Sequence, residues 1–297
     1  TGATLQVTAP VDLSRLREPV SKGKLGNLNI SRLICGGNLI SGFAHSRDLV
    51  YVSSLLKRYF TEKKILDTWW ICEQCGINSI DMRTAPPEIN LLHTYWKQGG
   101  NMQWIARVYP REKNYKENVD MALNNGASAA LIMGNIGDQW ARDGKYDLLG
   151  QVLEYIKSKN IPAGLAGHEL VTIQDAEKHN LGADFYMKTL HSNRYWSWQP
   201  NQSKQDWVID NYDTDNYWSR TPEATIQYMQ SLNKPWIAFK VLAAGALSPE
   251  KGFRYVFENG ADFACVGMFD FQIVENANMF TSVVNDPGFK RKRDWMA

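Results

Sequence analysis

The segment LGADFYMKTLH, residues 181–191, shows how this chain is built. A glycine ends a helical pattern, and a short apolar run follows it directly. Glycine adopts the left-handed conformation that terminates many helices, and an apolar run of this length is typical of a strand buried on both faces. The same order of helical pattern, glycine and apolar run recurs in three other segments, 75–83, 125–135 and 259–269.

Further apolar runs lie between these four segments and bring the number of strand candidates to eight. Helical patterns separate them, for example at 145–159 and at 221–233, where Thr221 is a good N-cap and Pro222 takes the first helical position. The four additional strand candidates are 31–37, 102–110, 162–169 and 235–245.

Eightfold alternation of strand and helix predicts an α/β protein with a (β/α)8 barrel, the TIM-barrel architecture. We expect residues 31–297 to form this barrel as one domain and residues 1–30 to be an N-terminal extension packed on it. A doubly wound sheet is the alternative fold. It is disfavoured because no G-x-G-x-x-G motif opens a helix after a strand.

The composition and net charge of the chain indicate which kinds of binding partner to expect. The chain has 297 residues, of which 44% are hydrophobic and 22% charged, and its formal net charge of +2 is too small to argue for a nucleic-acid or membrane partner. No apolar stretch approaches the roughly 18 residues of a membrane span. We expect the basic run KRKRD, residues 290–294, to be a solvated tail. The start at Thr1 without methionine is compatible with an exported, periplasmic form whose leader was removed.

The four cysteines predict neither a disulfide framework nor a zinc site. Cys72 and Cys75 form a single C-x-x-C motif at the end of a helix-like segment, 48–75, just before a glycine. A lone motif of this kind on a helix flank favours packing in the core over redox or metal chemistry. Cys35 and Cys265 lie far from it in the sequence.

Polar residues at the ends of the predicted strands are the candidates for function. The active site of a (β/α)8 barrel lies at the C-terminal ends of its strands, and polar groups there are costly unless they are paired or used. The predicted catalytic residues are Asp81, His168, Lys188, His191 and Lys240. The predicted substrate-binding residues are Arg83, Arg107, Tyr195, Trp196, Trp198 and Asp270. Other strand-end candidates are Asn38, His45, Arg47, Tyr109, Asn135 and Asp138.

Two segments resemble aldo-keto reductases. GINSIDMRTAPPE, residues 76–88, is similar to the family segment that places a catalytic aspartate, here Asp81, after the second strand, and SRLICGGNLISG, residues 31–42, is similar to the first strand. Most of the chain, through FKVLAAGALSPEKGF, resembles a poorly characterised group of bacterial aldo-keto-reductase-like barrels. The resemblance implies the barrel fold.

The same resemblance argues against NADP-dependent reduction. The family places a tyrosine five residues after the aspartate, where this chain has Pro86. It also places a lysine on the third strand and a histidine on the fourth, where this chain reads WIARVYP and ALIMGN. Proton donation to a carbonyl during hydride transfer needs that tyrosine, made acidic by the lysine. We therefore expect no NADP cofactor.

Two non-redox mechanisms fit the remaining residues. In the first, His168, Glu169 and His191 hold a divalent metal such as zinc or manganese, which polarises a substrate carbonyl. In the second, Lys188 or Lys240 forms a Schiff base; the pair resembles the two lysines of deoxyribose-phosphate aldolase, which sit on the same two strands. Because alternate residues of a strand share a face, we expect Lys188 inside the barrel mouth and His191 on the following loop.

A long aromatic loop, residues 192–220, indicates the substrate class. Its tyrosines and tryptophans are interleaved with Asp and Asn residues, a combination that suits stacking on sugar rings and binding of their hydroxyl groups. Backbone amides at 243–247 and 266–268 are also compatible with a phosphate group. We therefore predict a non-redox lyase, isomerase or hydrolase that acts on a small, carbohydrate-like substrate. The alternatives are the Schiff-base enzyme, the NADP-dependent reductase and a non-catalytic sugar-binding barrel.

Overall fold

Eight parallel strands close into a barrel, as predicted. The computed structural model describes residues 11–43, 45, 49–198, 207–210 and 218–296. The strand order around the barrel is β10-β3-β4-β5-β6-β7-β8-β9, so each strand lies beside its neighbour in sequence and the last closes on the first. The strands are β3 (Leu33–Gly36), β4 (Ser79–Arg83), β5 (Gln103–Val108), β6 (Ala129–Ile132), β7 (Ala163–Gly167), β8 (Phe185–Thr189), β9 (Trp236–Phe239) and β10 (Phe263–Val266).

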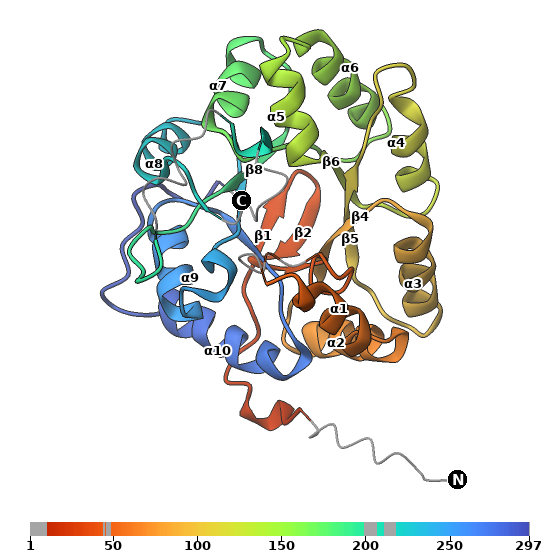
Figure 1. The fold of residues 1–297 in the computed structure, drawn as a ribbon. Helices are drawn as coiled ribbons and strands as arrows, with labels where there is room; N and C mark the ends of the chain where they lie inside the picture. The colour runs from red at the N-terminus through yellow and green to blue at the C-terminus, as the bar shows by residue number, and fades with distance from the viewer. Residues whose placement is uncertain (1–10, 44, 46–48, 199–206, 211–217, 297) are drawn as a thin grey trace.

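Helices surround the barrel as an outer ring (Figure 1). The segment expected as one helical stretch at 48–75 is two helices, because Thr61 begins a new helix and its hydroxyl accepts a hydrogen bond from the Lys64 amide. Within the described part of the chain, no helix is long and apolar enough to cross a membrane. The helices are α1 (Tyr51–Tyr59), α2 (Glu62–Gln74), α3 (Pro86–Lys97), α4 (Lys116–Leu123), α5 (Gly134–Arg142), α6 (Tyr146–Lys157), α7 (Leu170–Lys178), α8 (Pro222–Gln230), α9 (Pro249–Glu258) and α10 (Ile273–Val284).

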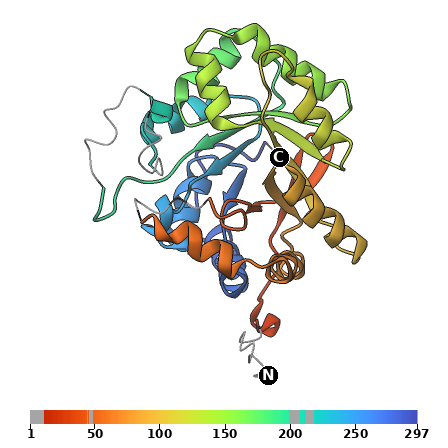
Figure 2. The same cartoon turned by 45° about the vertical axis from the view of Figure 1, so that its right-hand side comes forward.

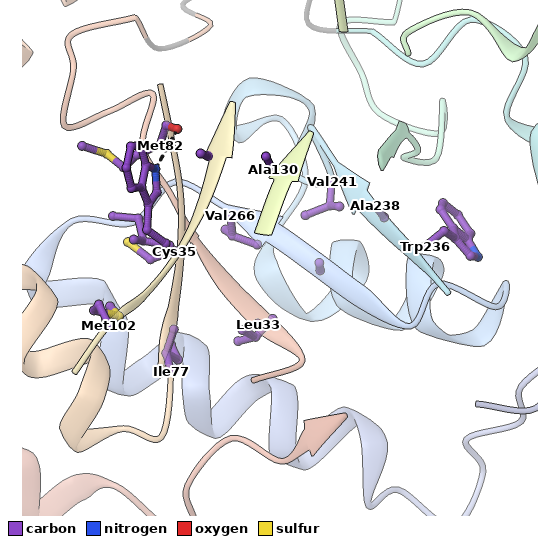
Figure 3. Close-up of a cluster of buried hydrophobic side chains, with 14 of the residues drawn as sticks. Leu33, Cys35, Ile77, Met82, Met102, Ala130, Trp236, Ala238, Val241 and Val266 are labelled. Atoms are coloured by element: carbon purple, nitrogen blue, oxygen red, sulfur yellow. Dashed lines mark hydrogen bonds between the residues drawn. The ribbon is translucent and has the colours of Figure 1, made fainter. Parts of the chain in front are cut away.

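The core has two layers, which follow from the alternation of side chains along each strand. Inward side chains such as Leu131, Phe185 and Met187 fill the lumen. Outward side chains such as Cys35 and Met82 pack between the barrel and the helices (Figure 3). A residue's parity on its strand therefore decides whether it can reach a site at the mouth.

The C-x-x-C motif lies in the outer core layer, as predicted. Cys72 and Cys75 are buried and carry free thiols. Burial raises the pKa of the Cys75 thiol to about 11, so this group stays protonated and unreactive at neutral pH.

A two-stranded hairpin closes the N-terminal end of the barrel. It belongs to the predicted extension and consists of antiparallel β1 (Lys22–Leu25) and β2 (Leu28–Ser31), which leads into β3. Leu25 and Ile30 are fully buried among the lumen residues. The hairpin is seen across the centre of the barrel in Figure 1 and beside the strands in Figure 2.

The basic C-terminal segment packs against the same end of the barrel, so the prediction of a solvated tail is wrong. Arg293 is buried and pairs with Asp262 at 3.1 Å, just before β10. The Trp295 ring lies between two guanidinium groups, those of Arg32 at 3.5 Å and Arg291 at 3.4 Å from the ring centroid. The buried carboxylate supplies the countercharge that the local sequence pattern did not reveal.

Candidate active site at the C-terminal mouth

The open end of the barrel holds a cavity of about 720 Å³. Its apolar wall includes Leu131, Met187 and Phe239, which continue the lumen layer toward the mouth. Its polar lining comes from seven of the eight strand ends and the loops that follow them. The polar side chains are Asn38, His45, Asp81, Arg83, Arg107, Tyr109, Asn135, His168, Lys240 and Gln272.

Asp81 and Arg107 form an ion pair on one side of the cavity. The Arg107 Nε lies 3.3 Å from Asp81 Oδ1, the Cys265 thiol donates to Asp81 Oδ2 at 3.7 Å, and Arg107 Nη1 donates to Asn38 Oδ1 at 2.7 Å. Burial raises the pKa of Asp81, while Arg107 opposes this effect. Arg107 on β5 is therefore the ion-pair partner of Asp81, the aspartate on which the sequence resemblance to aldo-keto reductases depends.

Arg83 lies beside Arg107, because the two residues are paired in register on β4 and β5. Its Nε is 3.5 Å from Glu88 Oε1, and its guanidinium carbon lies 5.3 Å from the centroid of the Phe43 ring at the rim. Tyr109 lines the cavity next to these arginines, and burial raises the pKa of its hydroxyl.

A histidine–carboxylate pair lies at the end of β7, two strands away from β5. His168 follows β7 and lines the cavity, and its Nδ1 is 2.8 Å from Oδ2 of the fully buried Asp138. The Asp138 carboxylate also accepts from the His168 and Glu169 amides and from the Thr172 hydroxyl. Since a carboxylate only accepts, His168 carries its proton on Nδ1, and the Nε2 lone pair is left available.

Two glycines of α5 bring Asp138 close to β7. A Cβ on Gly137 would lie 2.4 Å from the Ala166 carbonyl oxygen, and one on Gly134 would lie 3.0 Å from His168 Cε1. Glycine lowers the stability of a helix interior, so its presence here is explained by the close approach of helix and strand. Asp138 was a strand-end candidate in the sequence, but its pairing with His168 was not predicted.

Burial lowers the pKa of His168 to about 4, with Lys240 as the next cause. The hydrogen bond from Nδ1 to Asp138 acts in the opposite direction and is outweighed. His168 is therefore a neutral imidazole at physiological pH. Lys240 follows β9 with a positive φ of 58° and also lines the cavity. It stands close enough to His168 for its charge to act on the imidazole.

Lys188 points away from the lumen, so the expectation that it lies inside the mouth is wrong. Met187 lines the cavity, and Tyr186, which shares the parity of Lys188, packs in the outer layer. The buried Lys188 Nζ donates to the carbonyls of His168 at 2.6 Å and Thr189 at 3.2 Å. Burial lowers its pKa to about 8.

The three predicted metal ligands do not converge. Glu169 Oε1 accepts from the Val208 amide at 2.6 Å and pairs with Arg220 Nη1 at 3.1 Å, which fastens the long loop to β7. The Nδ1 of the fully buried His191 donates to the Ser192 carbonyl at 2.9 Å. Across the described ranges, no three His, Cys, Asp or Glu side chains are arranged to hold a metal ion.

Asp270 and the predicted aromatic residues lie outside the cavity lining. Asp270 pairs with Lys64 at 2.8 Å and links the loop after β10 to α2. Tyr195 and Trp198 pack near the buried Trp218, whereas Trp196 is 91% exposed. Within the loop, the acidic, amide and aromatic positions at 201, 206, 212, 213, 215 and 217 lie outside the described residues, as does Arg47.

Solved structures share this fold at low sequence identity. A protein described as "Putative aldo-keto reductase" from Pseudomonas aeruginosa is 17% identical, covering 92% of this chain and 99% of that chain with a TM-score of 0.63. A mutant of Gox0644 in complex with NADPH is 8% identical, covering 90% and 87% with a TM-score of 0.54. Phospho-2-dehydro-3-deoxyheptonate aldolase from Thermotoga maritima is 12% identical, covering 92% and 76% with a TM-score of 0.50.

No protein-family model matches the sequence, and neither does any curated protein. The structural likeness therefore establishes a (β/α)8 barrel and nothing finer.

Proposed function

We propose that this protein is a non-redox enzyme that transfers protons on a carbohydrate-like substrate bound in the mouth cavity. The observation that carries the proposal is the His168–Asp138 pair. It combines a neutral imidazole, a tautomer fixed by a buried carboxylate and an Nε2 to which no described protein group is bonded. A neutral imidazole with an available lone pair can accept a proton as a general base.

The base would act on a carbon next to a carbonyl group. His168 Nε2 takes the proton, the electron pair of the C–H bond forms a C=C bond, and the π electron pair of the carbonyl group moves to its oxygen to give an enolate. The Lys240 ammonium beside the imidazole would stabilise the negative charge on that oxygen. Return of the proton to the former carbonyl carbon, with transfer of the hydroxyl proton of the deprotonated carbon to the enolate oxygen, gives an isomerase. Loss of a leaving group from the carbon on the far side of the deprotonated carbon gives a lyase. Activation of a water molecule by the same base would give a hydrolase.

Size and lining support a sugar-like substrate. About 720 Å³ accommodates a small molecule, and polar side chains around an apolar wall suit hydroxyl groups and C–H faces together. A divalent metal remains a proposal to be tested by metal analysis. The predicted ligands His168, Glu169 and His191 point to different partners, so none of the proposed steps involves a metal.

Deuterium exchange tests this function. The protein is incubated in D2O with glucose, fructose, glucuronate or glucose 6-phosphate, and loss of the proton next to the carbonyl is followed by NMR. We expect exchange with at least one sugar, and a fall of roughly 100-fold or more in His168→Gln. His179→Gln, an exposed histidine, is the matched control. No exchange across the panel, or equal exchange in His168→Gln, would contradict the proposal.

A reductase is the second candidate, favoured by one observation. The Asp81–Arg107 pair stands where aldo-keto reductases carry aspartate and lysine, and Tyr109 lines the cavity beside it. The structure of mutant Gox0644 contains NADPH, but a likeness of 8% identity concerns the fold alone. We expect no appreciable NADPH binding in a fluorescence titration. Micromolar affinity would favour the reductase, and a ligand that binds without turnover would favour a sugar-binding barrel.

A further inference from the structure

We infer that the guanidinium groups of Arg83 and Arg107 together bind an anionic group of the substrate, a carboxylate or a phosphate. This inference rests on the proposed function and adds the charge of the substrate to it. The proton-transfer chemistry requires only a carbonyl and a neutral base, so the anion site concerns a different part of the ligand and a different wall of the cavity.

Register places the two arginines side by side. Arg83 on β4 is the direct partner of Arg107 on β5, and both lie two residues after inward positions, Asp81 and Ile105. Side chains in register on neighbouring parallel strands point to the same face. Two guanidinium groups are thus held together at the mouth, although their like charges repel each other.

Each arginine is paired through its Nε, which leaves the outer nitrogens for a ligand. Asp81 lies 3.3 Å from the Nε of Arg107, and Glu88 lies 3.5 Å from the Nε of Arg83. Arg107 Nη1 donates a hydrogen bond to Asn38 Oδ1. Among the described residues, no protein group accepts a hydrogen bond from Arg107 Nη2 or from either Nη of Arg83. The outer nitrogens of neighbouring arginines match the oxygens of a carboxylate or phosphate.

Arg293, which binds no ligand in the cavity, uses its outer nitrogens differently. Arg293 donates through both Nη atoms to Asp262 and to the carbonyls of Gly260, Leu232 and Lys234. Both of its outer nitrogens are used within the protein, whereas Arg83 keeps a side chain that is 35% exposed.

The remaining charges of the cavity are consistent with an anionic ligand. The cationic side chains in its lining are Arg83, Arg107 and Lys240, and Asp81 is the carboxylate in that lining. Tyr109 beside the arginines is neutral, because burial raises the pKa of its hydroxyl. Glu88 and Asp138 lie behind the lining and hold Arg83 and His168 from the protein side. The surface that meets the ligand is therefore positive.

Calorimetric titration of three sugars that differ in charge tests the inference. The probes are glucose, glucuronate and glucose 6-phosphate at constant ionic strength. We expect at least one anionic sugar to bind about tenfold or more tightly than glucose, because charged hydrogen bonds are the stronger ones. Arg83→Gln should lower the affinity for the anionic sugar to about the affinity of the same variant for glucose. Arg111→Gln, which alters an exposed arginine outside the cavity lining, should change nothing. Glucuronate and glucose 6-phosphate distinguish a carboxylate site from a phosphate site.

Arg107→Gln leaves the buried Asp81 without its ion pair, which destabilises the fold. The double variant Asp81→Asn/Arg107→Gln removes both charges and should also lose the anion preference. Equal affinity for charged and neutral sugars, or a preference that survives in Arg83→Gln, would overturn the inference. Deuterium exchange that depends on His168, together with equal calorimetric affinities for anionic and neutral sugars, would refute this inference and leave the proposed function standing. An Arg83-dependent preference without any proton exchange would instead refute the proposed function.

Discussion

At the scale of single residues, the sequence named most of the charged groups of the site but could not orient them. Asp81, Arg83, Arg107, His168 and Lys240 were predicted from their places at strand ends, and they line one cavity. Lys188 was placed on the wrong face because its strand is buried on both sides, so polarity does not reveal parity there. The role of Asp138 depends on a contact with a residue 30 positions away, which no local pattern contains.

Lys240→Met should raise the pKa of His168. The imidazole titrates near pH 4 because burial and the Lys240 ammonium disfavour its protonated form. Removing the ammonium leaves burial in place, so the pKa should move upward toward the ordinary value of about 6.5 without reaching it. Histidine resonances in NMR spectra over pH 3.5 to 8 would measure the shift, with exposed His179 as internal control. An unchanged His168 titration would show that Lys240 does not act on the imidazole.

The same reasoning predicts the acid limb of activity. Because the neutral imidazole is the base, kcat/KM should stay constant as pH falls and drop only as pH approaches about 4. In Lys240→Met the drop should begin at a higher pH. An acid limb that does not move with the NMR titration would separate His168 from the catalytic step.

Borohydride trapping separates the two lysines. Lys188 is buried outside the lumen and donates to two carbonyls, whereas Lys240 lines the cavity. Under the proton-transfer mechanism, reduction in the presence of a sugar that exchanges should leave both lysines unmodified in a peptide mass map. An adduct on Lys240 would establish the Schiff-base alternative. An adduct on Lys188 would contradict the orientation described for β8.

At the scale of elements, close approaches of backbone decide the geometry of the site. α5 carries glycine where it meets β7, and this contact sets Asp138 against His168. The long loop after β8 is fastened to β7 through Glu169, so a residue predicted as a metal ligand holds the loop instead. The glycine spacing in GNIGDQW, residues 134–140, indicates that this helix packs closely on another element. Only the closed barrel shows that this element is β7.

Gly137→Ala and Gly150→Ala form a matched pair of helix substitutions. A Cβ at Gly137 meets the Ala166 backbone oxygen at 2.4 Å, so α5 must shift, and we expect a loss of roughly 1–3 kcal/mol in the free energy of unfolding. A Cβ at Gly150 in α6 meets only Leu181 Cδ2 at 3.7 Å, so there the substitution should stabilise by about 0.5–1 kcal/mol. Urea unfolding measures both. A Gly137→Ala protein as stable as the parent would contradict the close approach.

At the scale of the whole molecule, the sequence predicts the barrel itself but not which segments close its N-terminal end. Each strand follows from a local signal, a helix end plus an apolar run, and eight such signals suffice for the architecture. The β1–β2 hairpin and the C-terminal segment around Trp295 have short, mixed patterns, and each finds its partner only in the finished fold. Asp262 illustrates the reason, since its countercharges Arg291 and Arg293 come from the other side of α10 in the sequence.

Trp295→Ala should weaken the whole barrel. The ring is stacked between Arg32, just before the first barrel strand, and Arg291, so it joins the two ends of the chain. Removing it deletes two cation–π contacts and exposes the stems of both arginines beside the buried Asp262, and we expect a loss of roughly 1–3 kcal/mol. Trp70→Ala, at a tryptophan of α2 that is 51% exposed, should cost less than about 1 kcal/mol. Thermal and urea unfolding compare the two variants. If both variants lose the same free energy of unfolding, the contacts of Trp295 in the C-terminal segment do not stabilise the barrel.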